Sequence, residues 1–407
     1  MKSSKINSTF SALSYPNYRL WFIGQMFSLV GTWMQSTAQG YLVYQITQSA
    51  AFLGYVSFAN GLPTWLFTLY GGVIADRIPR RKMLVITQSS MMVLAVILAA
   101  LTFTNTVQPW HIIVLAFLLG TANAFDTPAR QSFVTEMVDR KDMTNAIALN
   151  STMFNIGTVV GPAIAGLVYA LFGPGWCFTI NAISFIAVIF ALALMKLSNI
   201  VPAPSGDSAI KELKEGVAYA LHDNTIRSLL IHLGVIGVFG FGLLTLLPAW
   251  AVDVLKGDVT TNGLLLSARG IGSLIGALMI AYIGSRGTRG KIWSIGYFFT
   301  PIFFILFAFT RWVPLSLAVM VAIGWAAMAM LNTTNALIQS HVPDQLRGRV
   351  MGVYALVFMG GTPVGSLIAG WSADKYGEPI TVIAFSCVFM AMAILVFFLH
   401  PELRKLN

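Results

Sequence analysis

The sequence predicts an all-α membrane protein of twelve transmembrane helices, arranged as two repeats of six with both termini in the cytoplasm. Three observations lead to this fold class. The 407 residues are 57% hydrophobic and only 10% charged, whereas soluble domains carry roughly 25% charged residues. The apolar residues gather into runs of membrane-spanning length. Motifs of the first half of the chain return, more weakly, in the second half.

The apolar runs are the predicted membrane spans. A helix needs about 20 apolar residues to cross a hydrocarbon core of roughly 30 Å. The mostly polar start of the chain leads into a full-length run, so no cleavable signal peptide is expected. The twelve runs lie at 20–44, 52–75, 83–104, 111–133, 144–171, 177–196, 228–252, 260–284, 292–310, 313–338, 350–373 and 379–399.

A polar interval separates the first six runs from the last six. We predict an N-terminal half at 1–197, a cytoplasmic linker at 198–227 and a C-terminal half at 228–407. Within the linker, Ala209–Leu221 carries apolar residues at spacings of three and four, which is typical of an amphipathic helix on a membrane surface. This helix is either a plain connector or a regulatory element.

The positions of Lys and Arg predict the orientation. With both termini in the cytoplasm, only Lys256, Arg311 and Lys375 lie outside, and Arg269 lies within a span. Cytoplasmic connections of membrane proteins are enriched in basic residues. The net charge of +10 could indicate a nucleic-acid partner, but basic residues scattered over short loops exclude that interpretation.

A charged connection follows the second run and precedes the third. Residues 72–82 read Gly-Val-Ile-Ala-Asp-Arg-Ile-Pro-Arg-Arg-Lys. Gly72 lies one helical turn before Asp76 and allows a neighbouring helix to approach closely. Because bases that include Arg77 and Arg81 surround this single carboxylate, we expect a paired structural latch rather than a solvated face.

These motifs resemble the major facilitator superfamily. Residues 72–82 are similar to its Gly-x-x-x-Asp-Arg-x-Gly-Arg-Arg/Lys loop between helices two and three, with Pro79 in place of the usual glycine. The fifth run is similar to the helix-five motif of exporters, Gly-x-x-x-Gly-Pro-x-x-Gly-Gly, and otherwise reads as a generic packing kink. The residues that match that motif are Gly157, Gly161, Pro162 and Gly166.

Within this superfamily, the segments Phe125–Phe133, Asn145–Asn150 and Tyr15–Arg19 resemble the branch of enterobactin-type siderophore exporters and macrolide efflux pumps. The resemblance implies a secondary transporter that exports a small organic molecule, a drug or siderophore-like compound, across the bacterial inner membrane. It further implies proton antiport, alternating access and a monomer. The alternatives are an uptake transporter or facilitator of a small metabolite, and a non-transporting membrane scaffold or sensor.

The resemblance also implies a gate at the cytoplasmic side. Asp126 and Arg130 are one turn apart near the cytoplasmic end of the fourth run, so they can pair with each other, or Asp126 can pair with Arg77. The network either stabilises the gate or relays protons. Its predicted members are Gly72, Asp76, Arg77, Arg81, Asp126 and Arg130.

A polar stripe runs along one face of the first span. Its residues follow at intervals of 3, 4, 3 and 4, and they are Gln25, Ser28, Thr32, Gln35 and Gln39. In lipid such a stripe must face protein or water. It is either polar packing between helices or the wall of a substrate cavity, which helix one lines in the superfamily. Asn332 in the tenth run makes a similar, weaker case.

Arg269 lies within the eighth span, where a cation needs a partner or an aqueous cavity. It either extends outward to Asp253 or Asp374, or it binds an anionic substrate together with aromatic residues such as Trp250 or Phe239.

Other chemistry is not indicated. The sequence contains no phosphate-binding Gly-x-x-x-x-Gly-Lys-Ser/Thr loop, no His-Glu-x-x-His and no Gly-x-Ser-x-Gly. We therefore expect neither an enzyme nor a metal or cofactor site. The expected partners are a small-molecule substrate, protons and the lipid bilayer.

Overall fold

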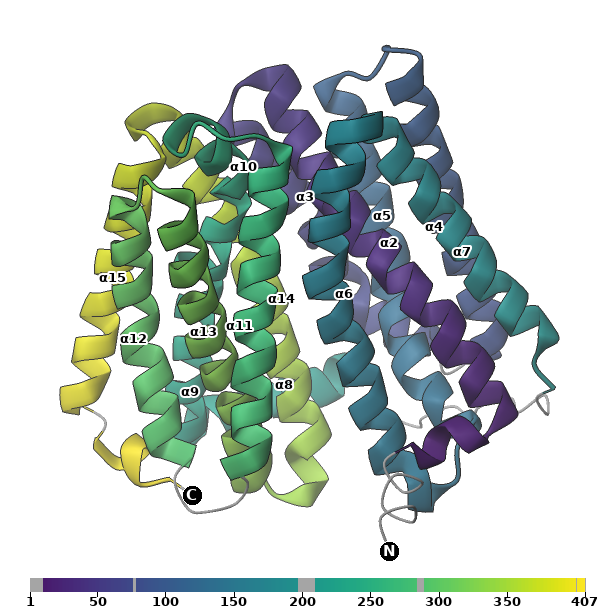
Figure 1. Ribbon diagram of the computed structural model, residues 1–407. Coiled ribbons are helices and arrows are strands. Elements are labelled where there is room, and N and C mark those ends of the chain that lie inside the picture. The colour runs from purple at the N-terminus through teal and green to yellow at the C-terminus, as the bar shows by residue number, and fades with distance from the viewer. Residues whose placement is uncertain (1–9, 76–77, 197–208, 284–288, 400, 407) are drawn as a thin grey trace, which may run out of the picture.

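The computed structural model describes residues 10–75, 78–196, 209–283, 289–399 and 401–406. The long helices run side by side, and the first and last described residues lie at the same end of the bundle (Figure 1). We call this the terminal end and the opposite one the far end. Asp76 and Arg77 lie outside the described residues, as do the surroundings of Gly72, so the central part of the predicted latch is not described.

Long helices cover the first six predicted runs. They begin after a short 3-10 turn, η1 (Ser11–Ser14), and two further turns, η2 (Val134–Glu136) and η3 (Arg140–Asp142), connect the fourth helix to the fifth. The helices are α2 (Pro16–Thr47), α3 (Ala50–Ala75), α4 (Arg80–Phe103), α5 (Pro109–Phe133), α6 (Met143–Phe172) and α7 (Pro174–Leu194).

The last six runs are also helical, but the seventh is broken. It consists of α9 (Asn224–Phe239), η4 (Phe241–Leu246), α10 (Leu247–Ala249) and the π-helical η5 (Trp250–Val254). Gly240 and Pro248 lie at the changes of geometry, as expected of a flexible residue and of one that lacks a backbone N–H. The others are α11 (Val259–Ile283), α12 (Arg289–Phe309), α13 (Val313–His341), α14 (Asp344–Tyr376) and α15 (Glu378–Leu399), followed by η6 (Pro401–Lys405).

Within the described residues, 10 helical segments are long and apolar enough to cross a membrane. The helices α2 and α3 are not among them, although both pack within the bundle. Side-chain amides and hydroxyls on α2 lower its hydropathy. A helix or helical series thus lies over each predicted run, while the count of twelve membrane crossings and the cytoplasmic place of the termini remain predictions.

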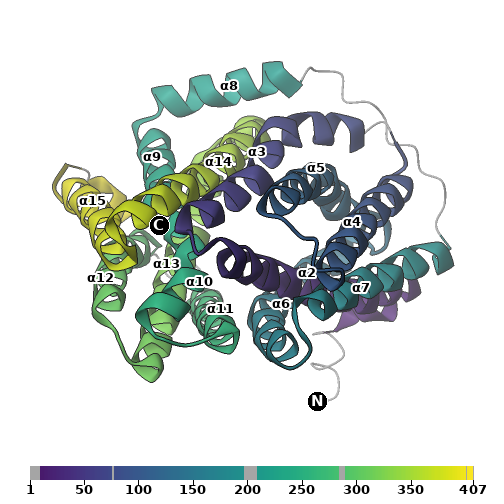
Figure 2. The same cartoon turned by 90° about the horizontal axis from the view of Figure 1, so that it is seen from above.

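Seen from above, helices α2–α7 lie on one side and α9–α15 on the other (Figure 2). The two groups meet mainly where α3 packs against α14 and α6 packs against α11. We call them the N-group and the C-group. The predicted amphipathic helix is α8 (Ala209–His222), which lies across the edge of the bundle (Figure 2). Glu215 of α8 pairs with Arg349 of α14, and this ion pair connects α8 to the C-group.

Glycines allow the closest approaches inside each group. A methyl group at Gly120 of α5 would lie 2.0 Å from the Asn60 carbonyl oxygen of α3, and one at Gly324 of α13 would lie 2.0 Å from the Arg269 carbonyl oxygen of α11. No larger residue fits either crossing unless the helices separate. The backbone around Arg269 is therefore held firmly against α13.

Candidate functional site: a polar cavity between the two groups

A cavity of about 720 Å³ lies between the N-group and the C-group. Its wall is mixed, with apolar and aromatic side chains interrupted by amides and hydroxyls. The aromatic lining residues are Trp33, Phe154, Phe185, Phe241, Phe304, Tyr354 and Phe358. Ligand cavities of this size usually combine an apolar wall with a few polar groups that orient the ligand.

The helix α2 supplies one polar side of the cavity. Thr32, Gln35 and Gln39 line it, whereas Gln25 is buried nearer the terminal end and is not part of the lining. Gln35 is held in place because the Asn181 side-chain amide of α7 donates a 2.7 Å hydrogen bond to its Oε1. The part of the predicted stripe from Thr32 to Gln39 therefore faces the cavity, whereas Gln25 lies among packed helices.

The C-group supplies Arg269 and Asn332, which both line the cavity. The two acids considered as partners for Arg269 are engaged elsewhere: Tyr44 donates to Asp253, and the Ser49 hydroxyl donates to Asp374 at 2.7 Å. No ion pair joins Arg269 to either acid among the described residues, and Arg269 instead lines the cavity. Its Nε is buried without a hydrogen-bond partner among the described residues.

The expected aromatic neighbours of Arg269 are not in the lining. Trp250 is fully buried and stacks on Phe307, with ring centroids 4.6 Å apart, and Phe239 packs on Phe385. The broken seventh run turns both side chains into the C-group core. That break is a tertiary feature which the hydropathy pattern does not reveal.

Sequence reasoning missed five amides that line the cavity. Each lies within a predicted apolar run, and an amide at such a position must face protein or water. That rule, applied to every run rather than to the first and the tenth, would have found them. They are Asn60, Asn123, Asn155, Asn181 and Asn262.

The helix-five motif lies on the face of α6 that contacts both groups. Gly161 packs on Trp33 of α2, where an added methyl would lie 2.5 Å from the Trp33 Cβ. Gly166 faces α11, where an added methyl would lie 3.0 Å from the Thr260 Cα. Gly157 also faces Trp33, and Pro162 lines the cavity. The motif permits close packing of α6 with α2 and α11.

A buried carboxylate organises the terminal end of the N-group. Asp126 accepts hydrogen bonds from the Thr87 hydroxyl at 2.8 Å and the Gln88 amide at 2.9 Å, and its Oδ2 lies 3.7 Å from the Arg130 Nε. Arg81 does not join this cluster, because it donates to the Ala193 carbonyl of α7 at 2.9 Å. Thr87 and Gln88 are the partners that sequence reasoning missed.

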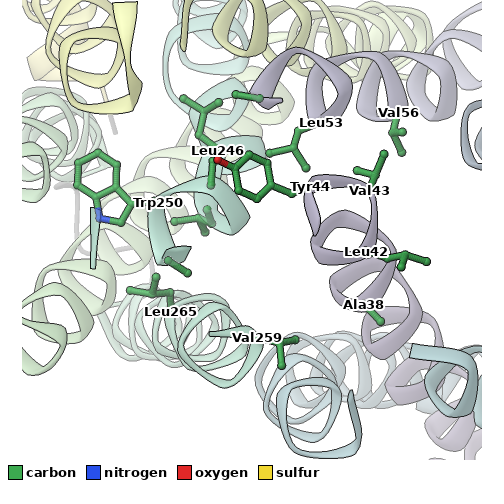
Figure 3. Packing of buried hydrophobic residues seen from close by; sticks show 14 of the residues in the cluster. Ala38, Leu42, Val43, Tyr44, Leu53, Val56, Leu246, Trp250, Val259 and Leu265 are labelled. Atoms are coloured by element: carbon green, nitrogen blue, oxygen red, sulfur yellow. The ribbon is translucent and has the colours of Figure 1, made fainter. Parts of the chain in front are cut away.

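The far end of the cavity is closed by contacts between the two groups. An apolar layer contains Tyr44 and Leu53 of the N-group together with Leu246 and Val259 of the C-group (Figure 3). Hydrogen bonds between the groups lie in or near the same layer: Tyr44 to Asp253, Ser49 and the Ala51 amide to Asp374, and Thr245 to the Leu53 carbonyl.

Two groups of long helices around a central cavity are the arrangement expected of a multi-pass membrane transporter. Comparison with protein families agrees with this class, because residues 7–407 match the family described as transmembrane secretion effector. The chain belongs to this family of the major facilitator superfamily. It is a transporter and not an enzyme, located in the bacterial inner membrane.

Curated relatives match over almost their whole length. The chain is 27% identical to the staphyloferrin A transporter of Staphylococcus aureus, over 95% of this chain and 97% of that protein. It is 29% identical to the multidrug efflux pump Tap of Mycolicibacterium fortuitum, over 90% and 91%. It is 22% identical to the enterobactin exporter EntS of Shigella flexneri, over 96% and 93%.

Solved structures agree in fold. The nucleoside transporter NupG superimposes with a TM-score of 0.77 at 14% identity, covering 94% of this chain and 98% of that one. A bacterial homologue of the human lysosomal transporter Spinster, in an inward-facing and unoccupied conformation, gives a TM-score of 0.75 at 14% identity, covering 96% and 99%. At these identities the likeness concerns the fold alone.

Proposed function

We propose that this chain exports a small organic molecule, of the drug or siderophore-like kind, across the bacterial inner membrane by alternating access. The observation that carries the proposal is the cavity between the N-group and the C-group. Its volume of about 720 Å³ suits a drug-sized molecule. Two of the relatives named above are an efflux pump and an exporter, Tap and EntS, which supports export rather than uptake.

The proposed substrate contacts are the polar residues of the cavity wall. Thr32, Gln35 and Gln39 provide hydrogen-bonding groups from the N-group, and Arg269 and Asn332 provide them from the C-group. Contacts from both groups to one molecule couple its binding to the relative position of the groups. Binding energy that differs between two conformations is what shifts their populations.

The far-end closure is one of the two states that alternating access requires. In the other state the far-end layer around Tyr44 and Leu53 separates and the terminal end closes. We propose that the cluster around Asp126 and Arg130, with Arg81 and the 72–77 segment, latches the terminal end in that second state. We propose residues 1–197 and 228–407 as the two moving halves, working as a monomer.

Proton antiport is part of the same proposal, and its support is the family membership. A direct test uses proteoliposomes that enclose a pH-sensitive dye. A proton gradient is imposed and a drug or siderophore is added, while the flux of both is followed. Substrate-dependent proton movement in opposite directions is the expected result. Substrate flux without proton movement would refute antiport, and flux only in the uptake direction would refute export.

A matched pair of variants on α2 connects the flux to the cavity. Gln39→Leu removes an amide from the lining, whereas Gln45→Leu removes an exposed amide of the same helix that accepts from Tyr169 outside the cavity. We expect Gln39→Leu to lower flux several-fold and Gln45→Leu to leave it near the wild-type level. Equal effects of the two changes would contradict the placement of the substrate in this cavity.

A further inference from the structure

The cavity has one charged side chain. Among the described residues that line it, Arg269 carries a full charge, and all the other polar lining residues are neutral amides, hydroxyls or a phenol. A cavity wall with a single fixed cation attracts anions and repels cations, because opposing charges in a partly dehydrated space are weakly screened. The sign of this charge therefore selects between classes of substrate.

Arg269 lacks a counter-charge in the described part of the chain. No carboxylate there lies within ion-pair distance of it, and its Nε is buried without a hydrogen-bond acceptor. Removal of a charge from water without a partner costs several kcal/mol. A planar guanidinium is satisfied best by a planar oxyanion that accepts two parallel hydrogen bonds. The missing partner can be supplied by the transported molecule.

A second unsatisfied group lies on the same face of the same helix. Asn262 is completely buried, lines the cavity, and has neither its amide nitrogen nor its carbonyl oxygen hydrogen-bonded within the described structure. Asn262, Leu266, Arg269 and Ser273 follow at intervals of four, three and four and all line the cavity. They form one stripe along α11.

Buried amides without partners are rare and costly. Asn262 and Arg269 are seven positions apart, so their backbone positions are separated by roughly 10 Å along the helix axis at 1.5 Å per residue. A molecule that extends along the stripe spans this distance, with its middle against the Leu266 side chain and the aromatic wall, and it meets Asn262 when this buried amide turns toward the cavity.

We propose that the exported molecule carries an oxyanion, most simply a carboxylate, that pairs with Arg269, and a hydrogen-bonding group roughly 10 Å away that meets Asn262. The segment between the two groups is apolar or aromatic. This inference rests on the proposed function, because it names the substrate class of the same cavity. It excludes lipophilic cations, which the lone positive charge repels.

The test uses two fluorescent probes that differ only at one end. Dansyl-6-aminohexanoate ends in a carboxylate, and dansylcadaverine ends in an ammonium on a chain of similar length. Binding to the purified full-length protein in lipid nanodiscs is measured from the dansyl fluorescence. Because binding is measured without flux, its outcome is independent of whether the protein exports or takes up the probe.

We expect the carboxylate to bind more tightly than the ammonium by about tenfold or more, the effect of one charge-assisted hydrogen-bonded pair. Arg269→Gln should remove this preference, and Arg269→Lys should retain part of it because the charge remains while the planar fork is lost. Arg347→Gln is the matched control, since Arg347 is a surface residue paired with Asp344 outside the cavity. It should leave the preference unchanged.

Asn262→Leu separates the two ends of the proposed site. The dansyl end is common to both probes, so this change should weaken both about equally, roughly two- to tenfold, and leave their ratio unchanged. Thermal unfolding of each variant shows that it is folded. Equal or stronger binding of the ammonium probe, a preference that survives Arg269→Gln, or no binding of either probe would each overturn the inference.

Discussion

The contact between α6 and α11 gives a quantitative prediction about the conformational equilibrium. Gly263 of α11 faces α6, and a methyl group there would lie 2.4 Å from the Pro162 carbonyl oxygen and 3.2 Å from the Gly166 backbone. Ordinary van der Waals contact begins at 3.4 Å. In Gly263→Ala, the two helices must therefore separate by about 1 Å at this crossing.

The energetic consequence follows from the rigidity of backbone contacts. Overpacking of a tight interface costs about 1–3 kcal/mol. The cost falls only on the conformation in which the far end is closed and α6 and α11 touch. A penalty of about 2 kcal/mol shifts the equilibrium away from this conformation by roughly 30-fold. Gly263→Ala should consequently populate a state with the far end open.

The assay measures the separation of the two groups at the far end. Spin labels are attached at Thr106→Cys and Trp312→Cys, one exposed loop position in each group, and the distance between them is measured. The native cysteines Cys177 and Cys387 are replaced in this background, so that only the two introduced cysteines are labelled. Double electron–electron resonance should show a larger long-distance population in Gly263→Ala than in the parent.

A glycine without neighbours provides the control for this measurement. Gly352 of α14 has no atom within 4 Å of the added methyl group, so Gly352→Ala should leave the distance distribution unchanged. If Gly263→Ala is folded and gives the parent distribution, the reasoning from this glycine contact is refuted.

Two further predictions concern the ends of the bundle. Asp126→Leu should lower the melting temperature by several degrees, because Gln88 and Arg130 lose their buried acceptor at a cost of about 2 kcal/mol. Asp126→Asn should lower the melting temperature less, because the amide oxygen still accepts a hydrogen bond. Equal losses in the two variants would contradict this reasoning. Tyr44→Phe removes the hydrogen bond to Asp253 across the far end, so the same spin labels should show an open population increased roughly fivefold for a loss of about 1 kcal/mol. An unchanged distribution would show that the Tyr44 hydrogen bond does not contribute to closure of the far end.

The sequence by itself determined the class of protein and most helix positions. Membrane-length apolar runs and a low content of charge leave few alternatives, because every backbone polar group in a bilayer must be bonded within its own segment. The 72–82 connection and the motif from Gly157 to Gly166 indicated the superfamily, which the family comparison confirmed. Local composition carries this information, so no tertiary structure was needed.

The sequence also identified polar residues that needed an explanation, but it left their roles open. Arg269 could have extended outward or faced a cavity, and in the structure it lines the cavity without an ion pair to a described acid. Gln25 and Gln39 belong to one stripe, yet only Gln39 reaches the cavity. Helical periodicity gives the direction of a side chain, whereas the depth of a cavity depends on where other helices touch.

Only the tertiary structure revealed the residues that gain their meaning from partners distant in sequence. Thr87 and Gln88 hold Asp126 across two helices, and Asn262 is notable because nothing in the described structure pairs with it. The break of the seventh run turned Trp250 away from the cavity. Each of these outcomes depends on the contact of side chains from separate helices, and the order of residues along one helix does not encode that contact.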